Sequence, residues 1–167
     1  MATRQTIETA AQRRWLGTAV PRKEDPALLT GEGRFIDDLE PFPNLYHAAI
    51  LRSPHAHARI TAIDASRALA IDGVAGVLTG EHVKASCKPF AVGIETQPSF
   101  YPCAIDRVRY AGEPVAVVVA RDRYLAEDAL EAIAVSYEPL PAVVSIDDAL
   151  APSSIALLEN VGSIVVH

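Results

Sequence analysis

The feature that most constrains the fold is a strand-like run followed at once by a helix-like segment. Residues 115–120 read VAVVVA, a β-branched and small apolar run typical of a strand that is buried on both faces. From Asp122 to about Ile133 the apolar residues recur at helical spacing, and Asp122 can cap the helix. Residues 134–137 predict another strand, which two prolines stop. This succession predicts a β-α-β unit over residues 108–137 and a mixed α/β (α+β) fold.

Further short elements are predicted along the rest of the chain. Hydrophobic patterns indicate strands at residues 45–52, 58–64, 74–79 and 108–110. The two isoleucines of the second of these strands are out of step by one residue, which predicts a bulge or a twisted end. Helical turns are expected at residues 66–69, with Ser66 as cap, and at 146–150. Residues 80–102 are expected to be mainly loop, and the hairpin-like segments favour some antiparallel pairing within a mixed sheet.

Composition bounds the class of protein. The chain has 167 residues, which suits one domain, and half of them are hydrophobic. The formal charge of -6 disfavours a nucleic-acid or anionic-membrane binder, since both need a basic face. No apolar run is long enough to span a bilayer, so no membrane segment is predicted. Two cysteines make no disulfide framework, which favours a reducing compartment and a cytoplasmic location.

The N-terminal residues 1–14 are expected to form a flexible arm, because they are polar or small without a sustained pattern. Arg13 and Arg14 superficially resemble a twin-arginine export signal. The residues that follow include Pro21 and several charges rather than an apolar stretch, so no export is expected.

Two kinds of residue invite a chemical hypothesis and have a simpler structural reading. His55 and His57 lie two residues apart, so on an extended segment both rings could reach one metal ion. A zinc site needs two more ligands, and the favoured alternative is hydrogen bonding in a tight turn or at a subunit interface. Cys87 and Cys103 are interpreted as structural thiols, although lysines near Cys87 could lower a thiol pKa.

Carboxylates and glycines also give no complete site. Adjacent acidic residues occur as four pairs, and neighbours in sequence point in different directions, so surface positions or helix caps are expected. The Gly31-x-Gly33 sequence lacks the remaining parts of a phosphate loop and is interpreted as a turn with positive φ.

Several ordered segments carry a family resemblance. They are residues 22–35 with 37–38, 51–60 (LRSPHAHARI), 73–74 with 77–80, 108–116 (VRYAGEPVA), 126–129 and 137–143 (YEPLPAV). Together they resemble the N-terminal region of the large subunit of molybdenum hydroxylases. That family includes xanthine dehydrogenase, aldehyde oxidase and aerobic carbon monoxide dehydrogenase. The resemblance covers the chain from about Trp15 to about Ala149.

The resemblance implies an α/β hammerhead domain over residues 15–150, followed by an extension at 151–167 toward molybdopterin-binding domains. The complete enzymes hydroxylate carbon with water as the oxygen source and pass electrons through 2Fe-2S clusters to FAD. The implied partners are therefore the molybdopterin-binding remainder of the large subunit and the iron–sulfur and FAD subunits. The family's molybdenum-pocket motifs have no counterpart in this chain, so no catalytic, cofactor-binding or metal-binding residue is assigned.

The sequence therefore predicts a structural docking module that is inactive and binds no cofactor by itself. A stand-alone, non-catalytic interaction module derived from the same family is the alternative. Either module would present an interface, for which the candidates lie in two of the resembling segments: Arg52, Ser53, His55, His57, Gly112 and Glu113.

Overall fold

The computed structural model describes residues 19–39, 41–90 and 99–158. The chain forms two compact units, and the boundary between them lies between Pro43 and Asn44. The residues proposed as an N-terminal arm and the Arg13-Arg14 pair lie outside the described ranges. The expected boundaries at residues 14 and 150 stay predictions.

The first unit holds two short helical elements: α1 (Asp25–Leu29) and the 3-10 helix η2 (Ile36–Asp38). Pro26 stands in the first turn of α1, where its fixed φ suits a helix start. Gly31 has a φ of 76°, so the predicted positive-φ turn is confirmed there. Neither element contains a buried residue.

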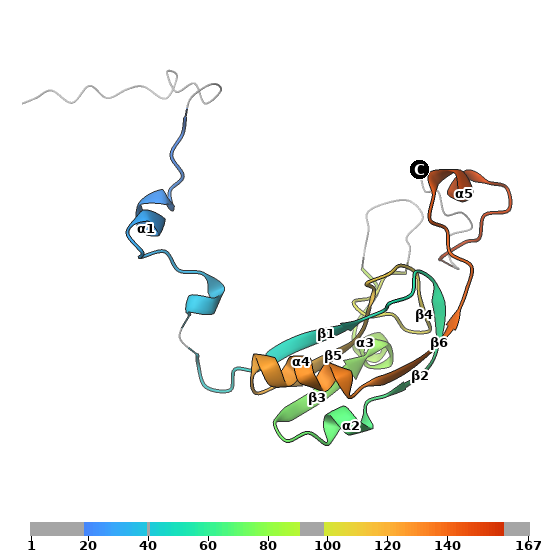
Figure 1. Ribbon diagram of the computed structural model, residues 1–167, viewed down its shortest axis with the longest axis horizontal. Helices are drawn as coiled ribbons and strands as arrows, with labels where there is room; N and C mark the ends of the chain where they lie inside the picture. The colour runs from blue at the N-terminus through green and yellow to red at the C-terminus, as the bar shows by residue number, and fades with distance from the viewer. Residues whose placement is uncertain (1–18, 40, 91–98, 159–167) are drawn as a thin grey trace, which may run out of the picture. The chain divides into compact units, whose positions relative to one another are not determined.

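The second unit contains two three-stranded antiparallel sheets (Figure 1). In the first sheet, β5 (Pro114–Ala120) lies between β1 (His47–Arg52) and β3 (Val74–Thr79). This central position buries Val115, Ala116, Val118 and Ala120, which confirms the strand predicted from the apolar run.

The second sheet has β2 (Ala58–Asp64) in the middle, with β4 (Arg107–Val108) on one side and β6 (Ala134–Pro139) on the other. The register of β2 against β6 shifts between Ile60 and Ala62, which confirms the predicted bulge.

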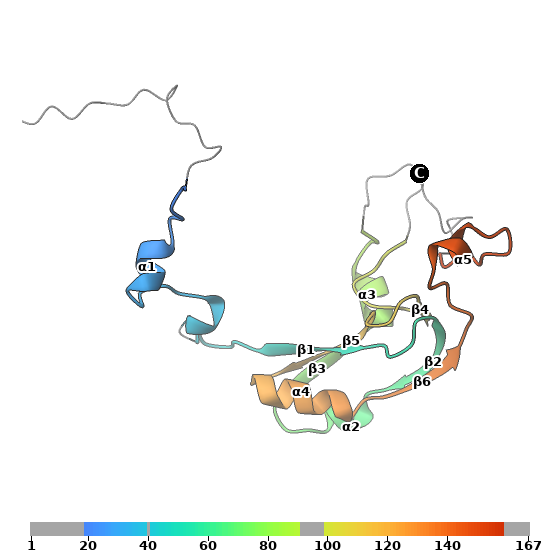
Figure 2. The same ribbon diagram turned by 45° about the horizontal axis from the view of Figure 1, so that its top comes forward.

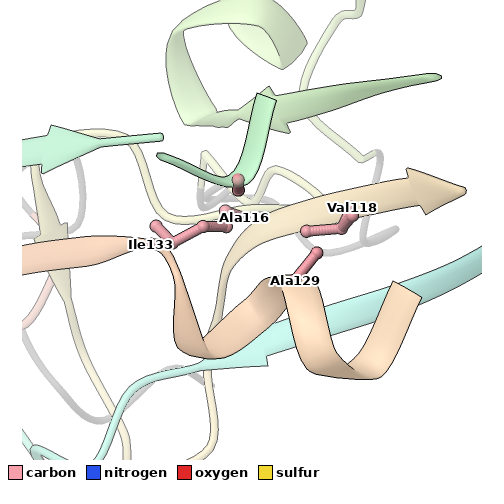
Figure 3. Close-up of a cluster of buried hydrophobic side chains, with 5 residues drawn as sticks. Ala116, Val118, Ala129 and Ile133 are labelled. Atoms are coloured by element: carbon pink, nitrogen blue, oxygen red, sulfur yellow. The ribbon is translucent and has the colours of Figure 1, made fainter. Parts of the chain in front are cut away.

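The longest described helix, α4 (Arg123–Glu131), covers one face of the first sheet. The Asp122 side chain accepts a hydrogen bond from Leu125 N at 2.8 Å, so the predicted cap is confirmed. Figure 3 shows the core beneath the helix, where Ala129 and Ile133 meet Ala116 and Val118 of β5. Alanine on both sides lets helix and sheet approach closely.

Three short helices complete the unit: α2 (Ser66–Leu69), α3 (Gly80–Ser86) and α5 (Ile146–Leu150). Residues 80–102 were expected to be mainly loop, and the structure differs at their start, where α3 forms. That helix begins at a capping box in which Thr79 N donates to His82 Nδ1 at 3.1 Å. The predicted Ser66 cap is also wrong, because Ser66 is the first helical residue and donates its N–H to Asp64 Oδ1.

The mixed α/β class is confirmed, and one detail of its strand pairing differs from the prediction. Strand β5, helix α4 and strand β6 follow one another as expected, but the two strands belong to different sheets. All pairs of named strands are antiparallel, so neither sheet is mixed. The chain passes through α4 from one sheet to the next, which local sequence patterns do not specify. No helix in the described ranges is long and apolar enough to cross a membrane.

Candidate interface of two hydrogen-bonded loops

Two loops far apart in sequence form one hydrogen-bonded unit, which we call the two-loop cluster: residues 52–57 and 109–114. Ser53 N donates to Glu113 O at 2.9 Å, and Gly112 N donates to Ser53 O at 2.8 Å. Arg52 Nη1 donates to Gly112 O at 2.9 Å. The loops follow β1 and precede β5, whose pairing ends at Arg52 and Pro114. The sheet register thus brings four of the predicted interface residues together.

Ser53 organises the first loop from a buried position, with 3% of its surface exposed. Its hydroxyl accepts a hydrogen bond from His55 N at 3.0 Å and donates to His55 O at 3.1 Å. Burial raises the pKa of the nearby Tyr137 phenol, although a hydrogen bond with Ser53 opposes that shift. The His55 ring lies 4.8 Å from the Tyr137 ring, tilted by 59°. These contacts attach the loop to β6.

His57 is buried and turns away from the second loop. Its Nδ1 lies 2.6 Å from Pro141 O, a carbonyl that can only accept, so Nδ1 carries the proton. Its own carbonyl accepts from Leu140 N at 2.9 Å. Nε2 is buried without a partner in the described structure. His55 and His57 therefore both contact residues 137–141, and no group of three His, Cys, Asp or Glu in the described ranges is arranged to hold a metal ion.

The second loop contains a buried carboxylate, Glu113, which is 7% exposed. It accepts a hydrogen bond from Arg109 N, and one of its oxygens lies 4.0 Å from Arg109 Nη1. Desolvation raises the pKa of the Glu113 carboxyl, and the hydrogen bond from Arg109 only partly offsets this effect. Gly112 has a φ of 91°, a conformation that favours glycine and lets the chain reverse before β5.

Arg109 is the functional candidate that the sequence did not single out. Its guanidinium donates through Nε to Leu157 O at 3.0 Å and through Nη1 to Arg107 O at 3.1 Å. Its Nη2 also lies 3.7 Å from Asp106 Oδ1. Arg109 thus joins the two-loop cluster to the segment that follows α5. Its signals in the sequence are its place in the resembling segment 108–116 and its spacing of four residues from Glu113.

A cavity of about 390 Å³ adjoins the cluster and is lined by Arg109 and Glu113 together with Cys103, Asp106 and residues from α3. Burial raises the pKa of the Cys103 thiol, which is opposite to what a thiolate nucleophile needs. Cys87 is exposed, and both cysteines are free. The cluster thus combines hydrogen-bonded backbone with polar and charged side chains.

Comparison with known proteins agrees with this architecture. A family model described as "Aldehyde oxidase and xanthine dehydrogenase, a/b hammerhead domain" matches residues 30–141. The chain is 43% identical to the 6-hydroxypseudooxynicotine dehydrogenase complex subunit gamma of Paenarthrobacter nicotinovorans, over 81% of this chain and 18% of that relative. It is 36% identical to the carbon monoxide dehydrogenase large chain of Afipia carboxidovorans, over 93% of this chain and 19% of that relative.

Solved structures give the same result. Quinoline 2-oxidoreductase from Pseudomonas putida 86 superposes with a TM-score of 0.71 at 44% identity, over 84% of this chain and 18% of that chain. Fold and matched region together define a hammerhead domain of the kind found in molybdenum hydroxylase large subunits. The chain belongs to the aldehyde oxidase and xanthine dehydrogenase family. It spans about a fifth of the length of these relatives.

Proposed function

We propose that the chain is the N-terminal structural and docking module of a molybdenum hydroxylase large subunit. In the complete complex, carbon would be hydroxylated with water as the oxygen source, and electrons would pass through 2Fe-2S clusters to FAD. The observation that carries this proposal is the two-loop cluster, in which Arg52, Ser53, Gly112 and Glu113 are fixed by mutual hydrogen bonds. Loops fixed before binding lose little conformational entropy when a partner docks.

The charge and exposure of the cluster also support a docking role. Arg52 is exposed while its guanidinium is held by Gly112, so it presents a cation at a fixed position. Glu113 is buried, and its carboxyl lies 4.0 Å from the guanidinium of the partly buried Arg109, which reinforces the turn. Arg109 also holds Leu157, within the 151–167 extension that we propose leads toward the molybdopterin-binding domains.

The molybdopterin cofactor is assigned to the remainder of the large subunit rather than to this chain. The cofactor has a phosphate group, whereas the cavity beside the cluster is lined by the carboxylates of Glu81, Asp106 and Glu113. The cations there are Lys84 and Arg109, and Arg109 already donates hydrogen bonds to Leu157 O and Arg107 O. The lining does not fit an anionic cofactor, so no catalytic step is assigned to these residues. The free thiols of Cys87 and Cys103 support a cytoplasmic location.

The proposal is tested by a tagged pull-down from the native host, with molybdenum, iron and flavin quantified in the eluate. Recovery of a large partner with molybdenum, together with iron–sulfur and FAD chains, is the expected result. Replacement Arg52→Glu reverses the exposed charge of the cluster and should reduce recovery at least tenfold. Arg67→Glu, on the exposed surface of α2, is the matched control and should leave recovery unchanged.

A metal-free and partner-free monomer would contradict the docking proposal. It would instead favour the stand-alone interaction module. Equal recovery with Arg52→Glu and Arg67→Glu would keep the family assignment but remove the two-loop cluster as the docking surface.

A further inference from the structure

A second surface feature lies outside the two-loop cluster: an apolar groove between the two sheets. Its volume is about 430 Å³. The side chains of Ile60, Ile63, Leu69 and Val77 supply its apolar lining, and Glu81 and His82 also line it. In Figure 2, α2 lies where the chain passes from β2 to β3, the two strands that border the groove.

The groove runs along β2 where the strand bulges and where its edge opposite β6 is open. It is lined by the consecutive residues Ile60, Thr61, Ala62 and Ile63. The register of β2 against β6 shifts between Ile60 and Ala62, so side chains do not alternate regularly there and all four contribute to the groove. Thr61 and Ala62 are exposed there.

This edge of β2 is largely unpaired in the described structure. On this side only β4 pairs with β2, through Ala58 and Arg59, and Ile60 N donates to Asp106 O at 2.9 Å. From Thr61 to Asp64 no described strand continues that pairing. Strand β3 is the outer strand of its own sheet and contributes Val77 and Thr79 to the groove. Open edges present backbone N–H and C=O groups that favour an added strand.

We infer that the groove receives an extended segment with alternating apolar residues, supplied by the rest of the large subunit, which adds as a strand to the β2 edge. This inference rests on the proposed function. Main-chain hydrogen bonds would provide affinity, and the apolar lining would select the side chains.

Two observations favour this occupant. The relatives are about five times longer than this chain, so most of the large subunit is available to supply the segment. The groove also adjoins the cavity of the two-loop cluster, because Glu81 and Ile105 line both. A second copy of this chain is disfavoured as occupant, since two copies would each bring a net charge of -6.

The test probes an array of overlapping 12-residue peptides with the full chain. The peptides cover the chain of quinoline 2-oxidoreductase from Pseudomonas putida 86 outside the region that matches this protein. A small set of apolar peptides with alternating pattern should bind. Ala62→Arg places a long charged side chain at the groove and should reduce their binding at least tenfold.

Ser136→Arg is the matched control, because Ser136 is the exposed partner of Ala62 on β6. It should bind the peptides as the unmodified chain does, and thermal melting verifies that both variants are folded. Peptides whose backbone amides are alternately N-methylated should lose binding, because an added strand needs its N–H groups.

The inference is overturned if no peptide binds, or if Ala62→Arg and Ser136→Arg bind equally. It is also overturned if the chain forms a dimer that Ala62→Arg dissolves, because the occupant would then be a second copy. If the peptide-binding test of the groove fails but the pull-down recovers molybdenum-containing partners, the docking function still stands. If the pull-down fails as well, both the proposed docking function and the groove inference are overturned.

Discussion

Gly80 offers the sharpest test of the packing that supports the cavity and the groove. It is the first residue of α3 and is buried against the backbone of residues 104–105. A Cβ built on Gly80 would lie 2.0 Å from Ala104 O and 2.7 Å from the Cα of Ile105. Both neighbours are backbone atoms, so no side chain can rotate away. Gly80→Ala must therefore displace the start of α3 or the segment before β4.

The cost of this displacement follows from the geometry. Overpacking a filled interior costs about 1–3 kcal/mol, and the upper end applies here because the obstructing atoms are backbone. For a chain of this size each kcal/mol lowers the melting temperature by roughly 2–4 °C. We therefore expect Gly80→Ala to melt roughly 6–12 °C below the unmodified chain.

Gly76 provides a matched control on the adjoining strand β3. A Cβ on Gly76 meets no atom within 4 Å, and its φ is not positive. Gly76→Ala should therefore leave stability unchanged or raise it by up to about 1 kcal/mol, because alanine lowers the entropy of the unfolded chain. Thermal melting followed by circular dichroism measures both variants. A Gly80→Ala protein that melts within about 2 °C of Gly76→Ala would refute the reasoning.

Three further substitutions test the cluster and the helix beside it. Ser53→Ala removes both hydroxyl contacts with His55 and should lower the free energy of unfolding, measured by urea denaturation, by about 1–2 kcal/mol. Ser136→Ala, at an exposed position of β6, should leave the free energy of unfolding almost unchanged. Equal losses in the two variants would contradict the role of the buried hydroxyl. Glu113→Gln should change the pH profile of stability. Burial raises the Glu113 pKa above 4.5, so this carboxyl stays protonated to a higher pH in the native state than in the unfolded state. The wild-type chain should therefore lose stability relative to the variant as pH rises through the raised pKa. Parallel stability profiles for the two proteins between pH 4 and about 7 would contradict the raised pKa. Asp122→Ala removes the α4 cap and should cost about 1 kcal/mol in the same urea assay; a cost below about 0.3 kcal/mol would show that the cap contributes little.

The sequence predicted individual helices and strands better than it predicted which strands pair with one another. The VAVVVA run and the capped helix after it were identified because both signals are local. The assignment of β5 and β6 to different sheets depends on pairing with β1 and β2, which no local pattern encodes. Helix α3 was missed because Val83 is its only large apolar residue and its start depends on the Thr79–His82 contact.

At the candidate site too, the sequence indicated individual residues but not the contacts between them. Arg52, Ser53, Gly112 and Glu113 were selected because they belong to resembling motifs, and the structure joins them across about sixty residues of sequence. Their hydrogen bonds follow from the β1–β5 register, which was not predicted. Arg109 lies in one of the same motifs but was not selected, since its contact with the distant Leu157 carbonyl arises only on folding.

The pairing of early strands with late ones also determines when this chain can fold during synthesis. His47 of β1 pairs with Ala120 of β5, and Ala58 of β2 pairs with Pro139 of β6. Each early strand therefore leaves the ribosome several seconds before its partner exists, at a typical rate of about 5–20 residues per second. During that interval the nascent chain exposes unpaired apolar strands, and contacts so distant in sequence form slowly. Slower translation would lengthen this exposure, so yield should depend on chaperones that bind the first half of the chain.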